Sequence, residues 1–336
     1  MNAVVIEGPG KVQVAAIPEP SAGAGQVLIE VAACGVCGTD VHIYKGEYLG
    51  GYPVIPGHEF AGEVVEVGEG VTRFKRHDRV AVEPNLSCGR CRFCGLNEQN
   101  FCENWRAIGV TLPGAMAEYV AVPEGAAFAI GDLSYEAAAF MEPLSCVLHG
   151  MQKLDVRYGE RVLIIGAGPI GLLLAQVARD CGAGRVTMAD RIGSRLELAG
   201  WLVADEVVDS SGGFGPAADA GGGGYDAVID ATGVPAVMEA SIGLARLGGR
   251  ILWFGVAPKE AVVRIEPFEV FRKGLQILCS YTSLRTSVEA LDLLRGGRVR
   301  VEELVSHRLP LAGFAEAVEL LGHPEGAMKI QLVPAP

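Results

Sequence analysis

Short apolar runs separated by stretches of helical length dominate the chain beyond residue 156. The run at 162–165 is wholly apolar, which is typical of a strand buried on both faces. Strands that alternate with helices predict parallel βαβ units, so we expect a doubly wound α/β sheet here. The other predicted strands are 186–189, 207–208, 227–230, 250–254 and 275–279, and the predicted helices are 170–181, 194–202 and 235–244.

The first part of the chain has a different pattern. Its apolar runs are short, alternate with polar residues and are separated by glycine and proline turns, which favours strands. Several such strands in succession predict a small, β-rich, barrel-like domain. The predicted strands are 4–6, 12–15, 26–32, 61–67, 79–82 and 117–122.

The remaining segments are predicted from single features. Residues 134–153 are mostly apolar, and we expect Pro143 to divide them into two helical pieces, with His149 in a packing role. Residues 210–224 are rich in glycine, alanine and serine, which predicts a surface loop. We expect Gly248 and Gly249 to end the helix at 235–244. Two amphipathic helices at 288–294 and 315–321 and a strand at 328–332 complete the chain.

A glycine-rich turn follows the strand at 162–165. Gly166, Gly168 and Gly171 have the spacing G-x-G-x-x-G, and the helix that follows begins at Ile170. In a dinucleotide site these glycines allow the tight turn, the approach of the pyrophosphate and close helix–strand packing. Asp190 ends the next strand and can accept hydrogen bonds from the ribose hydroxyls, which favours NAD over NADP. Arg191 could instead pair with a 2′-phosphate, and an ordinary strand–turn–helix corner is the alternative interpretation.

Ligands of doubly wound sheets bind beyond the carboxyl ends of the strands. The residues that follow the last two predicted strands are therefore candidates for the nicotinamide side, although ordinary loop residues are the alternative. They are Phe254, Gly255, Val256, Ser280, Tyr281 and Thr282.

Composition and charge exclude several classes of protein. The 336 residues carry a formal net charge of −12, so nucleic acid and anionic membrane surfaces are not expected partners. The chain has no run of eighteen apolar residues and no leader with a charged start and apolar core, which favours a cytoplasmic protein.

Nine cysteines in a chain expected to be cytoplasmic point to metal ligands or core residues rather than disulfides. Four of them crowd one glycine-punctuated segment, which predicts a closed, tetrahedral structural zinc site; an iron–sulfur cluster is the main rival. These four are Cys88, Cys91, Cys94 and Cys102. The scattered Cys146, Cys181 and Cys279 stand in apolar surroundings, where we expect core positions.

A second set of metal ligands is separated more widely in the sequence. Cys37 and His58 offer a thiolate and an imidazole, and a catalytic zinc takes three protein ligands and keeps one position open. The third ligand could be Glu59 or the distant Glu142. Taken singly, Cys37 could form a dithiol with Cys34, and His58 could be an ordinary loop histidine.

The segment from Cys37 to His42, the string Gly57-His58-Glu59, the four-cysteine lobe and the later G-x-G-x-x-G occur in the order of one family. Together they resemble the zinc-dependent medium-chain alcohol dehydrogenases. The resemblance implies a GroES-like catalytic domain and a Rossmann coenzyme domain. It also implies the segments 1–147, with the zinc lobe at 85–104, then 148–285, and then 286–336, which returns to the first domain.

The same resemblance implies roles for single residues. Cys37, His58 and Glu59 would hold a catalytic zinc, which Glu142 would reach directly or through water. Thr39 would bind the substrate hydroxyl, and His42 would pass its proton to solvent. Arg195 would lie along the adenine, and the chain would form a dimer or tetramer.

The string Glu142-Pro143-Leu144-Ser145 resembles the polyol dehydrogenase branch, which includes sorbitol, xylitol and arabinitol enzymes. We therefore expect zinc-assisted hydride transfer from a secondary alcohol to NAD. Ile43 and the pair Thr282-Ser283 stand where sorbitol enzymes carry other residues, which disfavours sorbitol itself. An enzyme similar to L-threonine 3-dehydrogenase is the alternative. A non-enzymatic zinc protein that binds NAD and senses redox state is the alternative outside the enzymes. The net negative charge of the chain disfavours a zinc protein that binds nucleic acid.

Overall fold

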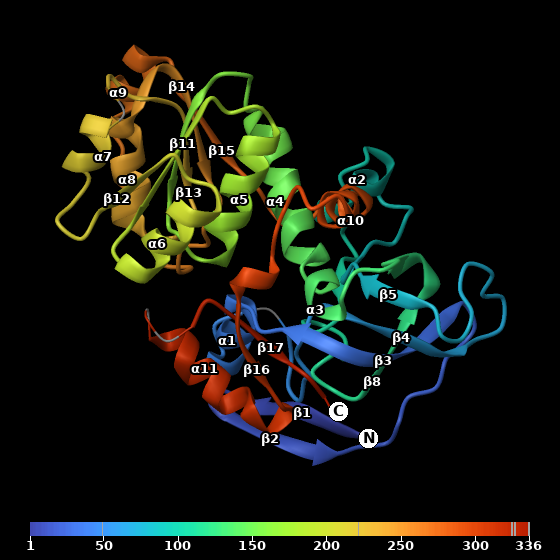
Figure 1. Ribbon diagram of the computed structural model, residues 1–336. Coiled ribbons are helices and arrows are strands. Elements are labelled where there is room, and N and C mark those ends of the chain that lie inside the picture. The colour runs from blue at the N-terminus through green and yellow to red at the C-terminus, as the bar shows by residue number, and fades with distance from the viewer. Residues whose placement is uncertain (49, 221, 324, 326, 335–336) are drawn as a thin grey trace. The chain divides into compact units, whose positions relative to one another are not determined.

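The computed structural model describes residues 1–48, 50–220, 222–323, 325 and 327–334. The chain folds into two compact units, residues 1–145 with 283–336, and residues 146–282 (Figure 1). No helix among these residues has the length and apolar character needed to cross a membrane.

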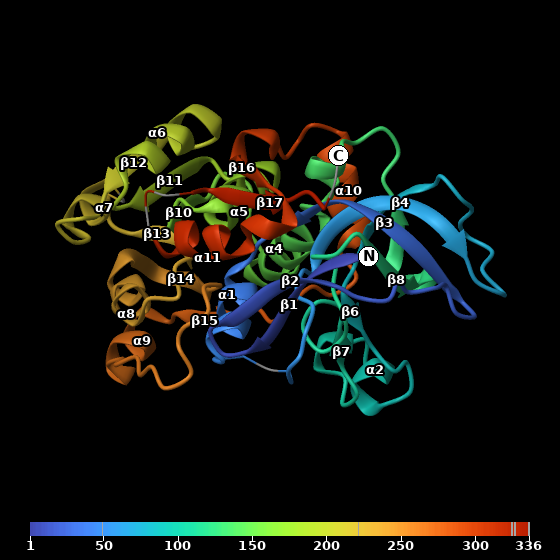
Figure 2. The ribbon, with the colours of Figure 1, turned by 90° about the horizontal axis from the view of Figure 1, so that it is seen from below.

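A seven-stranded sheet organises the first unit. Its strand order is β16-β17-β3-β4-β5-β9, with β8 also paired to β3, and every pair except β16–β17 is antiparallel. The strand β17 therefore lies beside β3 although it comes from the end of the chain (Figure 2). The strands are β3 (Gln26–Gly35), β4 (Glu59–Val67), β5 (Arg79–Val82), β8 (Tyr119–Pro123), β9 (Ala127–Ala129), β16 (Val305–Leu309) and β17 (Lys329–Leu332).

Two small two-stranded sheets and several helices complete this unit. The hairpin β1–β2 and the two-stranded sheet β6–β7, which encloses the four-cysteine segment, are antiparallel, and apolar residues of β1, β3, β4 and β5 share one core with α11. The elements are β1 (Asn2–Gly8), β2 (Lys11–Ala16), β6 (Asn85–Leu86), β7 (Arg106–Ala107), α1 (Gly38–Lys45), α2 (Arg92–Gly95), α3 (Tyr135–Ala138), α10 (Ser287–Arg295) and α11 (Phe314–Gly322), and α4 (Met141–Leu154) contains the boundary at 145.

The second unit is a six-stranded, fully parallel sheet in the order β12-β11-β10-β13-β14-β15. The chain order runs outward in both directions from the β10–β13 pair, so right-handed crossovers place the connecting helices on opposite faces. The strands are β10 (Arg161–Ile165), β11 (Arg185–Asp190), β12 (Glu206–Asp209), β13 (Tyr225–Asp230), β14 (Ala245–Trp253) and β15 (Gln276–Cys279). The helices are α5 (Pro169–Asp180), α6 (Gly193–Leu202), α7 (Gly215–Ala220), α8 (Pro235–Leu244) and α9 (Pro267–Lys273).

These elements confirm the predicted α/β class, and the predicted strands lie within three residues of those observed, except that β14 begins at Ala245, five residues before the predicted start at 250. Four predictions about local structure are wrong. Residues 134–153 do form two helices, α3 and α4, but Pro143 does not divide them, because it lies in the first turn of α4, where no backbone N–H is needed. Gly248 and Gly249 lie within β14, since α8 already ends at Leu244.

The third wrong prediction is the loop at 210–224, of which residue 221 lies outside the described residues. Its alanine-rich part forms α7, because Ala217 is buried and its carbonyl accepts a hydrogen bond of 2.9 Å from Tyr225 Oη. The fourth concerns the scattered cysteines. Cys181 and Cys279 are exposed and Cys146 is half-buried, because they lie at the end of α5, on the edge strand β15 and in α4.

The turn after β10 depends on one close approach, which gives a test. A Cβ on Gly171 would collide with the carbonyl oxygen of Gly166, so Gly171→Ala should shift the helix start and cost about 1–3 kcal/mol. We expect the thermal unfolding midpoint to fall by several degrees. Gly193→Ala is the control, because nothing lies within 4 Å of a Cβ there. Equal midpoints for both variants would contradict the packing account.

Candidate functional site

The structure brings Cys37, His58 and Glu59 together in the first unit. One ligand atom from each lies within 4.8 Å of the others. Cys37 is the N-cap residue of α1, Glu59 opens β4, and His58 directly precedes it. The register of the β3–β4 pair brings Glu59 close to Cys37, because Glu59 pairs with Gly35 at the end of β3, two residues before Cys37.

A fully buried carboxylate, Asp40, joins the two segments that carry these ligands. Its Oδ2 accepts a 2.8 Å hydrogen bond from the backbone N–H of Cys37, and its Oδ1 accepts one of 3.2 Å from that of Gly57. His58 Nδ1 lies 3.5 Å from Asp40 Oδ1, which is ion-pair range without hydrogen-bond geometry. Asp40 therefore orients the cysteine and the imidazole together, as carboxylates beside metal-binding histidines do.

Glu59 has a buried partner from the end of the chain. Lys329 Nζ, on β17, donates to Glu59 Oε2, and the two residues are 7 % and 2 % exposed. Gly35 leaves room for this pair, since a Cβ there would collide with Glu59 Oε2 and with the Lys329 side chain. The pair neutralises a carboxylate that would otherwise be buried alone.

The pKa shifts follow from these contacts. Burial alone would lower the pKa of His58, but the Asp40 carboxylate outweighs it and raises the pKa well above its usual value. Burial likewise opposes the charged form of Lys329, but the charge of Glu59, and then that of Cys37, raises the pKa of Lys329 overall. The site is thus a negative environment that favours bound cations.

The other predicted catalytic residues lie on α1 and α4 and are not members of the Cys37, His58 and Glu59 group. Thr39 and His42 are both on α1, and His42 Nδ1 lies 2.8 Å from Glu47 Oε2 at a partly exposed position. Glu142 is buried in the first turn of α4 and does not belong to the group within 4.8 Å. Cys34 is a buried core residue of β3 outside that group as well.

Cys88, Cys91, Cys94 and Cys102 form the predicted four-cysteine site, with their sulfur atoms within 4.8 Å of one another. The Cys91 Sγ lies 3.5 Å from that of Cys94 and 3.8 Å from that of Cys102. Tetrahedral Zn–S bonds of about 2.3 Å place sulfurs about 3.8 Å apart, so the set fits one zinc ion. Backbone N–H groups, first that of Arg90, lower the pKa of Cys88 to about 6, which favours the thiolate.

In the second unit the three glycines form the expected turn between β10 and α5. Gly166 has a φ of +105°, Gly168 is the N-cap of α5, and Gly171 is buried in its first turn, beside Ile170. Asp190 ends β11, and its carboxylate accepts hydrogen bonds from the N–H groups of Ala167 and Ile192. Asp190 therefore stabilises the glycine turn itself. Arg195, on α6, lies beside this turn, 3.7 Å from the position of a Cβ on Gly168.

The remaining cofactor candidates follow β14 and β15. Phe254 and Gly255 are half-buried, whereas Val256 is 78 % exposed. Ser280, Tyr281 and Thr282 follow β15, and the buried His149 contacts two of them. Its Nδ1 lies 2.7 Å from the Thr282 carbonyl oxygen and 3.3 Å from Ser280 Oγ, and burial lowers the pKa of His149. His149 thus fixes this segment, in agreement with its predicted packing role.

Sequence reasoning missed three residues that shape these sites. Asp40 stands three residues after Cys37, the spacing of a helix capping box, and this signal could have identified both the helix and its cap. Lys329 is a lone cation in an apolar strand, which is a weaker signal. Asp230, fully buried at the end of β13, accepts hydrogen bonds from Thr232 and Gly233, and its burial raises its pKa.

Comparisons with known proteins agree with this geometry. Residues 23–132 match the alcohol dehydrogenase GroES-like domain, and residues 169–295 match the zinc-binding dehydrogenase domain. The chain is 39 % identical to D-altritol 5-dehydrogenase of Agrobacterium fabrum, over 98 % of this chain and 99 % of the relative. It is 34 % identical to D-arabinitol dehydrogenase 1 of Uromyces fabae, over 99 % and 97 % of the two chains.

A solved structure extends the comparison to the cofactor. A zinc-binding dehydrogenase from Sinorhizobium meliloti 1021, bound to NADP, superimposes with a TM-score of 0.93 at 37 % identity and covers 99 % of each chain. The two metal-ligand clusters and the glycine turn of this chain are the features expected of a zinc-binding dehydrogenase with a dinucleotide cofactor. The chain therefore belongs to the zinc-binding medium-chain alcohol dehydrogenase family, whose members use zinc and NAD(P).

Proposed function

We propose that this enzyme oxidises a secondary alcohol of a sugar alcohol with NAD. The observation that carries the proposal is the Cys37, His58 and Glu59 group, oriented by Asp40 and neutralised by Lys329, in a chain that also has a dinucleotide turn. Two similar relatives are named for D-altritol and D-arabinitol, which are sugar alcohols and support this substrate class.

The donor set suits a catalytic zinc, since one thiolate, one imidazole and one carboxylate leave a fourth position for a ligand. When bound, zinc supplies Lewis-acid polarisation of an alcohol oxygen. Cys37, His58 and Glu59 would hold it. Asp40 faces Nδ1 of His58, so Nε2 is the nitrogen that we assign to the metal. Glu142 would act from outside this set.

The chain's own groups can remove the proton. Thr39 would bind the substrate hydroxyl and pass its proton to His42, three residues further along α1. The His42 side chain is 42 % exposed and contacts Glu47, so it can exchange that proton with water. The second unit would hold NAD, with its pyrophosphate at Gly166, Gly168 and the start of α5.

Two further features of the protein belong to this proposal. Free cysteines that serve as metal ligands are typical of a reducing compartment, which supports a cytoplasmic location. A homo-oligomer is supported by β15, which forms an edge of the parallel sheet, and by α9, whose Phe268 and Phe271 are 72 % and 80 % exposed. Edges and apolar patches of this kind are typical of subunit interfaces.

The first experiment is a screen for NADH formation with metal analysis of the same sample. The panel contains D-altritol, the arabinitols, xylitol, sorbitol, galactitol, erythritol, inositols and L-threonine, each with NAD and with NADP. A signal with a sugar alcohol, lost in Cys37→Ala, is the expected result. Activity on L-threonine alone would replace the polyol proposal, silence with two zinc ions per chain would place the substrate outside this panel, and silence with one zinc ion would contradict the catalytic site.

Metal content separates the two zinc sites. Cys94→Ser removes one of four thiolates from a closed site, so we expect the chain to lose one of its two zinc ions and to become less stable. Cys279→Ser is the matched control, because Cys279 is exposed and outside both clusters. Inductively coupled plasma mass spectrometry counts the metal, and two zinc ions in Cys94→Ser would contradict the assignment.

The buried pair at Glu59 gives a second test. Lys329→Met leaves the Glu59 carboxylate without its cation. Breaking a buried ion pair lowers the free energy of unfolding by about 3–5 kcal/mol. We expect kcat/KM to fall at least tenfold and zinc occupancy of the catalytic site to change. Lys329→Arg should restore most of both, and Lys259→Met, at an exposed position, should change neither. Wild-type kinetics in Lys329→Met would show that the pair is not needed.

Cofactor preference tests the role of Asp190. Asp190→Ala removes the ribose acceptor and the partner of the Ala167 N–H, so we expect the KM for NAD to rise about tenfold or more. The KM for NADP should change much less. Asp209→Ala, at the carboxyl end of the neighbouring strand β12, is the matched control. A wild-type preference for NADP would overturn the assignment of NAD.

Oligomeric state is the last test in this group. Phe268→Asp combined with Phe271→Asp should lower the mass measured by light scattering, because a charge disfavours an apolar interface. Tyr158→Asp is the control, since Tyr158 is 94 % exposed in another part of the second unit. An unchanged mass in the double variant would place the interface elsewhere.

A further inference from the structure

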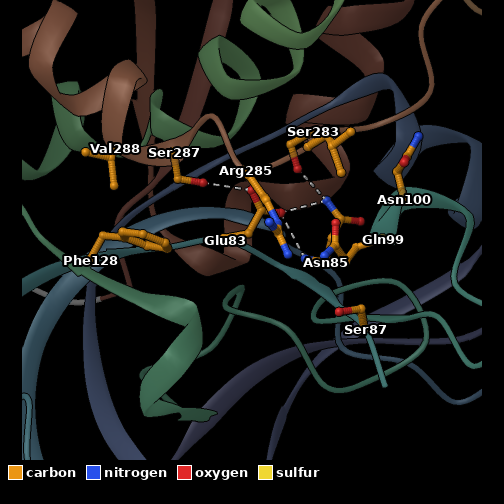
Figure 3. Close-up of a pocket in the computed structure, with 11 residues that line it drawn as sticks. Glu83, Asn85, Ser87, Gln99, Asn100, Phe128, Ser283, Arg285, Ser287 and Val288 are labelled. Atoms are coloured by element: carbon orange, nitrogen blue, oxygen red, sulfur yellow. Dashed lines mark hydrogen bonds between the residues drawn. The ribbon is translucent and has the colours of Figure 1, made fainter. Parts of the chain in front are cut away.

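A cavity of about 410 Å³, lined by both polar and apolar side chains, lies in the first unit, among β6, β9, the zinc lobe and the start of α10 (Figure 3). Its lining includes none of the residues assigned above to zinc or proton transfer, and the one residue it shares with the predicted substrate side is Ser283, whose hydroxyl accepts a hydrogen bond from Asn85. The volume is in the range of small-molecule sites. The lining side chains that the argument uses are Glu83, Asn85, Gln99, Phe128, Ser283 and Arg285.

One wall of the cavity, residues 283–287, is fixed by three side-chain hydrogen bonds. Asn85 Nδ2 donates to Ser283 Oγ at 3.0 Å, and Ser287 Oγ donates to Glu83 Oε2 at 3.0 Å. Thr286 Oγ1 donates to the carbonyl oxygen of Ser145 at 2.7 Å. Three anchors within five residues give the cavity a preformed wall, so a ligand would bind with little further ordering.

Arg285 stands out within this wall. Its backbone φ is +57°, a left-handed conformation that costs energy for a residue other than glycine. Such strain persists where surrounding contacts impose it, and it is frequent at binding sites. The guanidinium group lines the cavity and has no ion-pair partner within 4.0 Å among the described residues. Its donors are therefore available to a ligand.

The charges and hydrogen-bonding groups select the kind of ligand. Arg285 and Glu83 contribute one charge of each sign, so the cavity favours neither an anion nor a cation. The other polar lining groups are amides and hydroxyls, and the buried Gln99 Oε1 has no hydrogen-bond partner in the part of the chain that is described. A ligand must therefore both donate and accept, as hydroxyl groups do.

We propose that this cavity binds a neutral polyhydroxy molecule, a sugar or sugar alcohol, at a site separate from the zinc-binding group of Cys37, His58 and Glu59. Arg285 would donate to two neighbouring hydroxyl oxygens, and Gln99 would accept from a third hydroxyl. The half-buried ring of Phe128 would cover the C–H face of the ligand. This inference does not depend on which alcohol the enzyme oxidises.

Equilibrium dialysis with radiolabelled xylitol and sorbitol, without NAD, tests the proposal. The background is the full-length Cys37→Ala chain, in which a catalytic ligand is missing. We expect one molecule bound per chain, binding weakened at least tenfold by Arg285→Met, and binding weakened severalfold by Gln99→Leu. Arg76→Met, at an exposed position on the same unit, should leave binding unchanged.

Several results would overturn the proposal. They are the absence of polyol binding in Cys37→Ala, equal binding in Arg285→Met and Arg76→Met, or binding of inorganic phosphate in preference to the polyols. Circular dichroism and the unfolding midpoint show whether each variant is folded. The screen for NADH formation with the wild-type chain is independent, so failure of this cavity and failure of the proposed activity are distinguishable.

Discussion

The catalytic group depends on one buried carboxylate, Asp40. Its two oxygens hold the N–H groups of Cys37 and Gly57, and the same side chain faces the His58 ring. A buried carboxylate is stable only when such donors compensate for the water that it has lost. The same Asp40 contacts therefore fix the start of α1, which carries Cys37, and the loop before β4, which carries His58. Loss of the Asp40 carboxylate would free both segments and, with them, the metal ligands.

A second constraint is the crowding around the end of β3. This strand pairs with β4 on one side and β17 on the other, which brings Glu59 and Lys329 to the same place beside Gly35. The ion pair joins residues 270 positions apart, so Glu59 has its buried cation only where the last strand pairs with β3. The four-cysteine lobe differs, because its ligands are close in sequence and their geometry is local.

The sequence is most informative where function depends on local spacing. The strand, the three glycines and α5 were predictable together, because each glycine has a steric role within one turn. The four cysteines were predictable for the same reason. Lys329 was not, since only long-range pairing buries it beside Glu59. The helix α1 was missed because Gly38 and Thr39 are weak helix formers, and its start depends on the Asp40 cap. The exposure of Cys181 and Cys279 likewise depends on their places at a helix end and a sheet edge.

The central claim is that Cys37, His58 and Glu59 form a metal site distinct from the four-cysteine lobe. X-ray diffraction from crystals of the zinc-loaded protein, at wavelengths on both sides of the zinc absorption edge, tests it most directly. The account predicts two anomalous peaks per chain, one amid the four cysteine sulfurs and one bonded to Cys37 Sγ, His58 Nε2 and a carboxylate oxygen of Glu59. A single peak, at the four cysteines only, from crystals of active enzyme would contradict it.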